Sequence, residues 1–132
     1  MKVNICLILV FLGIHFMNAQ DIEGVWQWSS PDGTQNFEVE LERINDKEYR
    51  GNHCAIFDNG DRIDCNSEQD TFSIVMVKIA EDNYAGTIES SYEQSQGKIR
   101  MQYYVEEDLL HFNLTENPVG IFYLPEEAIL TR

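Results

Sequence analysis

Two cysteines and two histidines are the side chains best suited to chemistry in the chain beyond residue 20. Cys54 and Cys65 could form a disulfide or remain two buried thiols. His53 and His111 are candidate general bases, but a general base needs a carboxylate that holds it and a nucleophile that it faces. Neither histidine has such partners at a diagnostic spacing, and on a strand His53 would point away from its neighbour Cys54. We therefore expect both histidines to be structural and predict no enzymatic activity.

A group of acidic and amide side chains lies between residues 58 and 70. It consists of Asp58, Asn59, Asp61, Asp64 and Asp70. The spacing lacks the alternating oxygen ligands, the glycine and the distant glutamate of a calcium-binding EF-hand loop. We therefore predict that these side chains form a solvated hairpin tip, and we expect no bound metal and no cofactor.

The spacing of apolar residues indicates which elements must position these groups. Beyond residue 20 it repeats every second residue: Phe37, Val39 and Leu41 alternate with glutamates, which is typical of a strand with one buried face. The expected strands span residues 22–26, 37–41, 49–57, 60–65, 72–79, 84–92, 98–105, 109–114, 121–124 and 128–132. Short turns separate them, so we predict an all-β fold, and we favour a small antiparallel up-and-down barrel of about eight strands over a sandwich.

The cysteine pair fits this arrangement. Asn59-Gly60 is a hairpin signal because both positions accept a positive φ. Counting outward from that turn places Cys54 directly opposite Cys65, so a disulfide is the favoured state. The same count places Ile56 opposite Ile63. We therefore expect the bridge on the apolar side of the hairpin, in a hydrogen-bonded pair whose Cα atoms lie about 5.5 Å apart.

The first 20 residues have the pattern of a cleavable secretory signal. Lys2 precedes an apolar stretch from Ile5 to Phe16, which is shorter than the roughly 18–20 residues that span a bilayer. A cut after Ala19 would leave one domain over residues 20–132, secreted or periplasmic and without a membrane span. That domain holds 8 lysines and arginines against 23 aspartates and glutamates, a net charge of −15. Such acidity argues against nucleic acid as a partner.

The expected first strand carries Gly24-Val25-Trp26. A Gly-x-Trp at this place, followed by a run of hairpins, resembles the lipocalin-like (calycin) β-barrels, and the layout is similar to that of small exported bacterial proteins. The resemblance implies that Gly24 and Trp26 lie where the first strand enters the barrel. It also implies that a basic residue near the end of the chain packs over the indole, and Arg132 stands in the matching place.

The lipocalin-like resemblance favours binding of a small apolar or amphipathic ligand inside the barrel. The candidate ligand-binding residues are Tyr84, Tyr103, Phe112 and Phe122. The alternative is a protein-interaction or inhibitor module whose interior is packed. Interior volume should separate these two functions, because a ligand pocket needs a cavity of at least about 300 Å³. We expect a monomer in either case.

One strand concentrates basic residues on this acidic chain. Lys98, Arg100 and Gln102 alternate on the face of the 98–105 strand that also carries Tyr104. Two interpretations stay open at this point. The face is either an outward, solvated surface or a patch that binds an anion or a partner.

Overall fold

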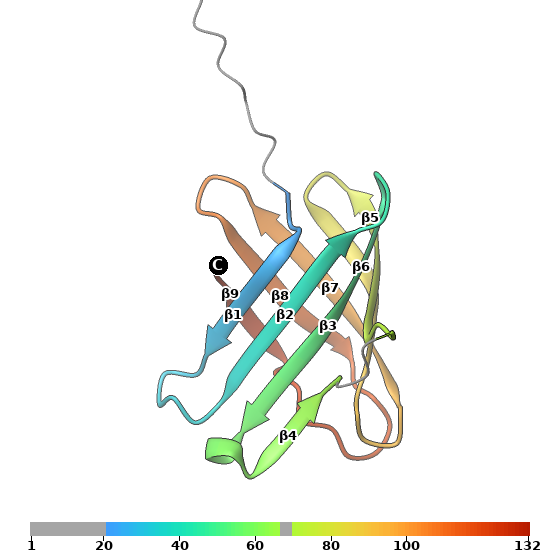
Figure 1. The fold of residues 1–132 in the computed structure, drawn as a ribbon. Coiled ribbons are helices and arrows are strands. Elements are labelled where there is room, and N and C mark those ends of the chain that lie inside the picture. Colours follow the sequence, from blue (N-terminus) through green and yellow to red (C-terminus); the bar gives the residue numbers. More distant parts are fainter. Residues whose placement is uncertain (1–20, 67–69) are drawn as a thin grey trace, which may run out of the picture.

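The chain forms an antiparallel, nearly closed β-barrel in a computed structural model that describes residues 21–66 and 70–132. Its strands are β1 (Gly24–Ser29), β2 (Asn36–Arg43), β3 (Glu48–Phe57), β4 (Arg62–Cys65), β5 (Ile74–Ala80), β6 (Asn83–Glu89), β7 (Gln96–Tyr104), β8 (Leu109–Glu116) and β9 (Glu127–Leu130). Eight of them follow one another around the barrel, and β4 pairs with β3 (Figure 1). The predicted all-β, up-and-down barrel is confirmed. The predicted signal peptide lies outside the described residues.

The ring of strands closes at one seam and divides at another place. At the seam, β1 meets the end of β9 through Gln27 and Thr131. The Gln27 N–H donates to the Thr131 carbonyl oxygen at 2.7 Å, and the Thr131 N–H donates to the Gln27 carbonyl oxygen at 2.9 Å. On the other side, β3 pairs with β5 over residues 48–51 and with β4 over residues 54–57. The wall therefore splits where β4 ends and β5 begins. This split positions the candidate site.

Alternating side chains fill the interior of the barrel. On β2, Phe37, Val39 and Leu41 are at most 2% exposed, while the glutamates between them face solvent, as the sequence pattern predicts. Trp26 and Phe112 are also fully buried and belong to the same core. Burial of so many large apolar side chains is the main term that stabilises the fold.

The Cys54–Cys65 disulfide is confirmed, but the face predicted for it is wrong. Cys54 pairs with Glu38 on the outer surface of the sheet, whereas the adjacent His53 is buried. The reason is the register of β3 against β2. It places His53 opposite Val39, and directly paired residues share a face of the sheet, so His53 turns inward and the cysteines turn outward.

The backbone pairing at the disulfide also differs from the prediction. The Asn66 N–H donates to the His53 carbonyl oxygen at 3.1 Å, so the cysteines occupy the neighbouring pair that exchanges no hydrogen bonds. Their Cα atoms are 4.0 Å apart, closer than the distance expected for a hydrogen-bonded pair. Closing this short loop stabilises the fold by about 3 kcal/mol on the chain-entropy account.

The turn between β3 and β4 is longer than a two-residue hairpin. Phe57 and Arg62 form the last cross-strand pair, and residues 58–60 make one turn of 3-10 helix, η1 (Asp58–Gly60). Asn59 has φ 56° and Gly60 has φ 100°. The positive φ values that the Asn-Gly signal predicts are therefore present, although they serve a four-residue loop.

The strand expected over residues 121–124 does not form. Gly120 has a φ of 88° and turns the chain, and Pro125 cannot donate to a ladder. The segment from 117 to 126 instead crosses the end of the barrel near β4, in orange-red at the bottom of Figure 1. Leu124 is 5% exposed there and covers the core.

Candidate functional site

Asp64 bridges the split in the barrel wall. It lies on the inner face of β4, and its side chain is fully buried. Oδ1 accepts from His53 Nε2 at 3.0 Å and from the Ser91 N–H at 2.8 Å, and Oδ2 accepts from Ser90 Oγ at 2.6 Å and from the Tyr123 N–H at 3.2 Å. These donors belong to β3, to the chain after β6 and to the 117–126 segment. One carboxylate therefore ties together three parts of the molecule.

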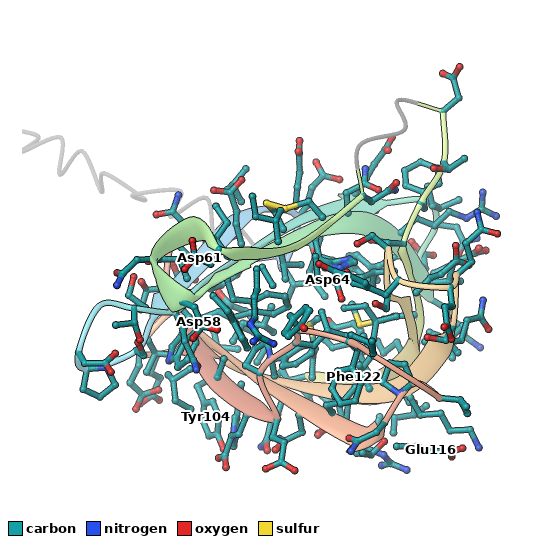
Figure 2. The ribbon with its side chains drawn as sticks, turned by 90° about the horizontal axis from the view of Figure 1, so that it is seen from below. Asp58, Asp61, Asp64, Tyr104, Glu116 and Phe122 are labelled. Carbon is teal, nitrogen blue, oxygen red and sulfur yellow. A yellow bond between two sulfur atoms is a disulfide. The ribbon has the colours of Figure 1, made fainter. Side chains whose placement is uncertain are left out.

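The predicted solvated tip fits Asp58 and Asp61 but is wrong for Asp64. Figure 2 shows Asp58 and Asp61 at the hairpin, whereas Asp64 lies among the side chains that the strands enclose. Asp58 pairs with Arg62 at 2.8 Å on the surface. Asp64 is turned inward because it pairs with the buried Ala55.

His53 forms the middle of a buried hydrogen-bond chain. Its Nδ1 lies 2.7 Å from Ser73 Oγ, and Ser73 Oγ also accepts the His53 backbone N–H at 3.1 Å. Because Nε2 faces the Asp64 carboxylate, the bonding pattern assigns the proton to Nε2 and leaves Nδ1 to accept the Ser73 hydroxyl. His53 is 2% exposed and Ser73 is 6% exposed.

The hydrogen bonds around Asp64 control its ionisation. Burial raises the pKa of this carboxyl, but the bonds from His53, Ser90, and the N–H groups of Ser91 and Tyr123 outweigh burial and lower the pKa from 3.8 to about 2. Asp64 is therefore a carboxylate across the physiological pH range.

A surface hollow of about 400 Å³ lies beside this cluster. Its lining is Cys65, Asn66, Thr71, Phe72, Ser73, Glu89, Ser90, Ser91 and Gln94. Ser73 and Ser90 therefore separate the hollow from the buried His53 and Asp64. The hydroxyl groups of both serines are bonded inward, toward His53 and Asp64 respectively.

The order serine, histidine, aspartate is that of a nucleophilic triad, but the backbone N–H groups of residues 89–92 beside it are all engaged within the chain. Acyl transfer needs free N–H groups that stabilise a developing oxyanion. Along residues 89–92, each backbone N–H already has an acceptor within the chain: Ser73 O, Ser95 O, Asp64 Oδ1 and Ser90 Oγ in turn. No oxyanion donor therefore remains along residues 89–92. What the hydrogen bonds of the cluster do is hold the split in the barrel wall closed.

The other end of the barrel, where β1 begins, has a different closure. The Arg132 guanidinium carbon lies 4.3 Å from the centroid of the Trp26 ring. Its Nη1 donates to the Glu23 carbonyl oxygen at 2.9 Å, and its Nε and Nη2 donate to the Asp108 carboxylate at 3.0 and 2.9 Å. Gly24 has a φ of 132°, a conformation that L side chains rarely adopt. The contact between Arg132 and Trp26 is the one that the sequence analysis expected from the resemblance.

The four aromatic ligand candidates are engaged in packing. The ring centroids of Tyr84 and Tyr49 are 5.2 Å apart, and the two rings meet edge to face. The ring centroids of Phe112 and Phe37 are 4.9 Å apart. Tyr103 contacts Trp26 at 6.0 Å and donates to Asp108 at 2.7 Å, and Phe122 is half-buried against the core.

Four surface hollows of about 280 to 500 Å³ are lined entirely by described residues. None of these four is lined by Tyr84, Tyr103, Phe112 or Phe122. Among the buried aromatic rings of the core, only Phe37 lines one of these four hollows.

His111 lies where the alternation on its strand predicts. Its neighbours Leu110 and Phe112 are fully buried, whereas its own side chain is 22% exposed and bonds Glu127 at 2.7 Å. The sequence analysis missed the partner of His53. A usable signal was present, because the predicted register already paired Ala55 with Asp64, and His53 shares the face of Ala55.

The comparisons with known proteins add no relative to this geometry. No protein-family model, curated protein or solved structure matches this chain. The barrel is therefore known from its own geometry. Among the described residues, no helix is long and apolar enough to cross a membrane, and no group of three or more histidine, cysteine, aspartate or glutamate side chains is placed to hold a metal ion. The disulfide is consistent with an oxidising, extracytoplasmic environment.

Proposed function

We propose that this chain is an exported, non-enzymatic binding module that recognises another polypeptide through its outer surface, with an interior that serves only as a core. The observation that supports this proposal is the packing of the aromatic side chains that would line a ligand cup. Tyr84, Tyr103 and Phe112 are at most 5% exposed, and their rings contact other buried rings. A carrier of apolar ligands would need that same volume empty.

A binding module also suits the chemistry of the buried cluster. Asp64 accepts four hydrogen bonds, and the described side chains include no buried polar atom without a partner. A fully satisfied network of this kind stabilises and rigidifies a fold. Reactive sites, in contrast, keep groups poised toward a substrate. The His53–Asp64 cluster therefore supports a structural role that keeps the outer surface in shape.

An apolar fluorescent probe tests the packed interior. Wild-type protein is titrated with N-phenylnaphthylamine beside Phe112→Ala, which opens a cavity, and Phe122→Ala, which removes a half-buried ring. We expect no saturable binding to the wild type below about 100 µM, because a packed core offers no cavity of ligand size. Saturable wild-type binding that Phe112→Ala weakens would overturn the proposal. Met101→Ala replaces Phe112→Ala if that variant does not fold.

Native mass spectrometry of the chain isolated from the cells that produce it tests the second half of the proposal. We expect complexes whose added mass is that of a polypeptide. A small-molecule adduct that is released on denaturation would contradict the proposal and favour the carrier function. A chain that carries neither in fresh extracts would also contradict it.

A further inference from the structure

The hollow at the split in the barrel wall differs in chemical character from the packed interior. Its volume is about 400 Å³, which is far more than a single ion occupies and lies within the range of pockets that hold organic groups. Hydroxyl, amide and carboxylate side chains make up most of its lining, and Phe72 supplies one aromatic ring. No lysine or arginine is among the described residues that line it. The hollow is therefore polar and carries no positive charge of its own.

Two carboxylates give this hollow a negative potential. Glu89 is half-buried in its lining, and the Glu89 side chain forms no hydrogen bond or ion pair with any residue that the structure describes. Asp64 lies behind the wall, where it accepts from Ser90 Oγ at 2.6 Å and from the Ser91 N–H at 2.8 Å, and both serines line the hollow. Charge in a concave, partly dry site is screened less than charge on an open surface. Both carboxylates therefore attract a cation that enters the hollow.

The cations of the chain itself are engaged elsewhere. In the strand register, Arg50 and Lys98 lie in the row of outward side chains next to that of Glu89. Arg50 pairs with Glu48 at 3.1 Å, and Lys98 pairs with Glu116 at 3.1 Å. Among the described residues, no lysine or arginine forms a salt bridge with either carboxylate of the hollow. A positive charge for Glu89 must therefore come from another molecule.

The lining favours a guanidinium group over an ammonium group. The acceptors at the hollow are spread over separate positions: the Glu89 carboxylate, the Ser91 hydroxyl and the Gln94 amide oxygen. A planar guanidinium carries five N–H donors and can reach several acceptors at once, and it also packs on aromatic rings. Phe72 is 40% exposed, and its ring centroid already lies 5.8 Å from the guanidinium carbon of Arg50. An arginine side chain thus uses the charge, the acceptors and the ring together, whereas an ammonium group uses mainly the charge.

We propose that the hollow at the split binds the guanidinium group of an arginine side chain that the partner polypeptide presents. The surrounding surface supports this choice, because a net charge of −14 for the whole chain attracts basic segments and repels acidic ones. The inference rests on the proposed function and deepens it by naming the chemistry of the partner. That partner carries an exposed arginine on a segment narrow enough to approach the split.

An NMR titration of the disulfide-bonded chain with the peptide acetyl-Gly-Arg-Gly-amide tests the site. We expect saturable shifts of the backbone amides of residues 71–73 and 89–94, with a Kd in the millimolar range because one side chain supplies the contacts. A matched peptide with citrulline keeps the shape of the arginine without its charge, and it should bind at least about tenfold more weakly. A lysine peptide should bind about threefold more weakly, because it keeps the charge and loses the fork of donors.

Two variants of the hollow separate this site from general attraction to an acidic surface. Glu89→Gln should weaken binding of the arginine peptide by at least about fivefold, and Glu42→Gln, on the exposed face of β2, is the control with the same change in net charge. Ser91→Lys places a cation at the exposed rim and should abolish saturable binding. Its control is Val25→Lys, since Val25 is 43% exposed on the outward face of β1. Unchanged thermal unfolding would show that the variants fold, and Ser91→Lys decides the question if Glu89→Gln does not.

The outcomes distinguish this inference from the proposed function. Absence of saturable shifts at the hollow up to about 50 mM peptide overturns the inference. Equal binding of the citrulline peptide, or equal weakening by Glu42→Gln and Glu89→Gln, also overturns it. If native mass spectrometry finds a bound polypeptide while the arginine peptide does not bind the hollow, the proposed function stands and this inference falls. If the peptide binds but the isolated chain carries only a small organic cation, the chemistry of the hollow stands and the proposed function falls.

Discussion

The two ends of the barrel are closed by the same type of contact in opposite surroundings. At one end Arg132 binds Asp108, with side-chain exposures of 25% and 37%. At the other end His53 binds Asp64, and both side chains are fully buried. Arg132 and Asp108 are 24 residues apart, whereas His53 and Asp64 lie on one hairpin and Asp64 reaches distant segments through Ser90, Ser91 and Tyr123. The difference between them is access to water.

Access to water decides how much each carboxylate matters. Around Asp108, water can replace a lost partner, so the ion pair contributes little to the free energy of unfolding. Around Asp64, water has no access, and removal of the carboxylate would leave several donors without acceptors. The comparison teaches that the less conspicuous end, with its buried histidine and two serines, is the end where the fold is most vulnerable. The predictions below measure that difference.

The largest effect is expected from Asp64→Ala. It should lower the free energy of unfolding by about 3–5 kcal/mol, because His53, Ser90 and two backbone N–H groups lose a buried acceptor. Equilibrium unfolding in urea provides the measurement. Asp58→Ala is the control: Asp58 is also salt-bridged on the same hairpin but lies in solvent, and should cost under about 1 kcal/mol. Equal losses would refute the role assigned to burial.

The pH dependence of stability should show the same contrast at a smaller magnitude. The folded pKa of Asp64 is about 2, against an ordinary value of 3.8, so the unfolded chain binds the proton more readily. Its contribution, about 2 kcal/mol, is therefore fully present above about pH 5 and is lost as the pH falls from there toward 2. The measured quantity is the unfolding free energy of the wild type minus that of Asp64→Asn. We expect this difference to shrink by about that amount toward pH 2, and a constant difference would contradict the assignment.

The exposed end was accessible to sequence reasoning, and the buried end was only partly so. Gly24-Val25-Trp26 resembles the first strand of a lipocalin-like barrel, and that resemblance implies a guanidinium of Arg132 over the indole. The disulfide followed from a turn signal and a residue count. Both inferences use short-range or terminal features that the fold does not rearrange.

The His53–Asp64 contact required knowledge of which face of the hairpin turns inward. The hairpin alone favours the Ile56 side, because isoleucine is more apolar than histidine and aspartate. The register of β3 against β2 decides otherwise, and Ile63 ends 50% exposed. A one-residue change of face exchanges every inward and outward side chain, so local hydrophobicity cannot replace the tertiary pairing. Ser90 and the Tyr123 N–H come from still more distant segments, and no spacing in the sequence indicates them.

The smallest effect is expected at the exposed end, from Arg132→Gln. This change removes the guanidinium over Trp26 and the bonds to Asp108, and it should lower the free energy of unfolding by about 1–2 kcal/mol. Asp108→Asn separates the two parts, since it keeps the contact with Trp26 and weakens the ion pair. We expect it to cost less than Arg132→Gln, and we expect added salt to reduce its effect, because exposed charges are screened. If Arg132→Gln instead destabilised the barrel as much as Asp64→Ala, burial would not be what distinguishes the two ends. The cation over the indole would then be as essential to closure as the enclosed carboxylate.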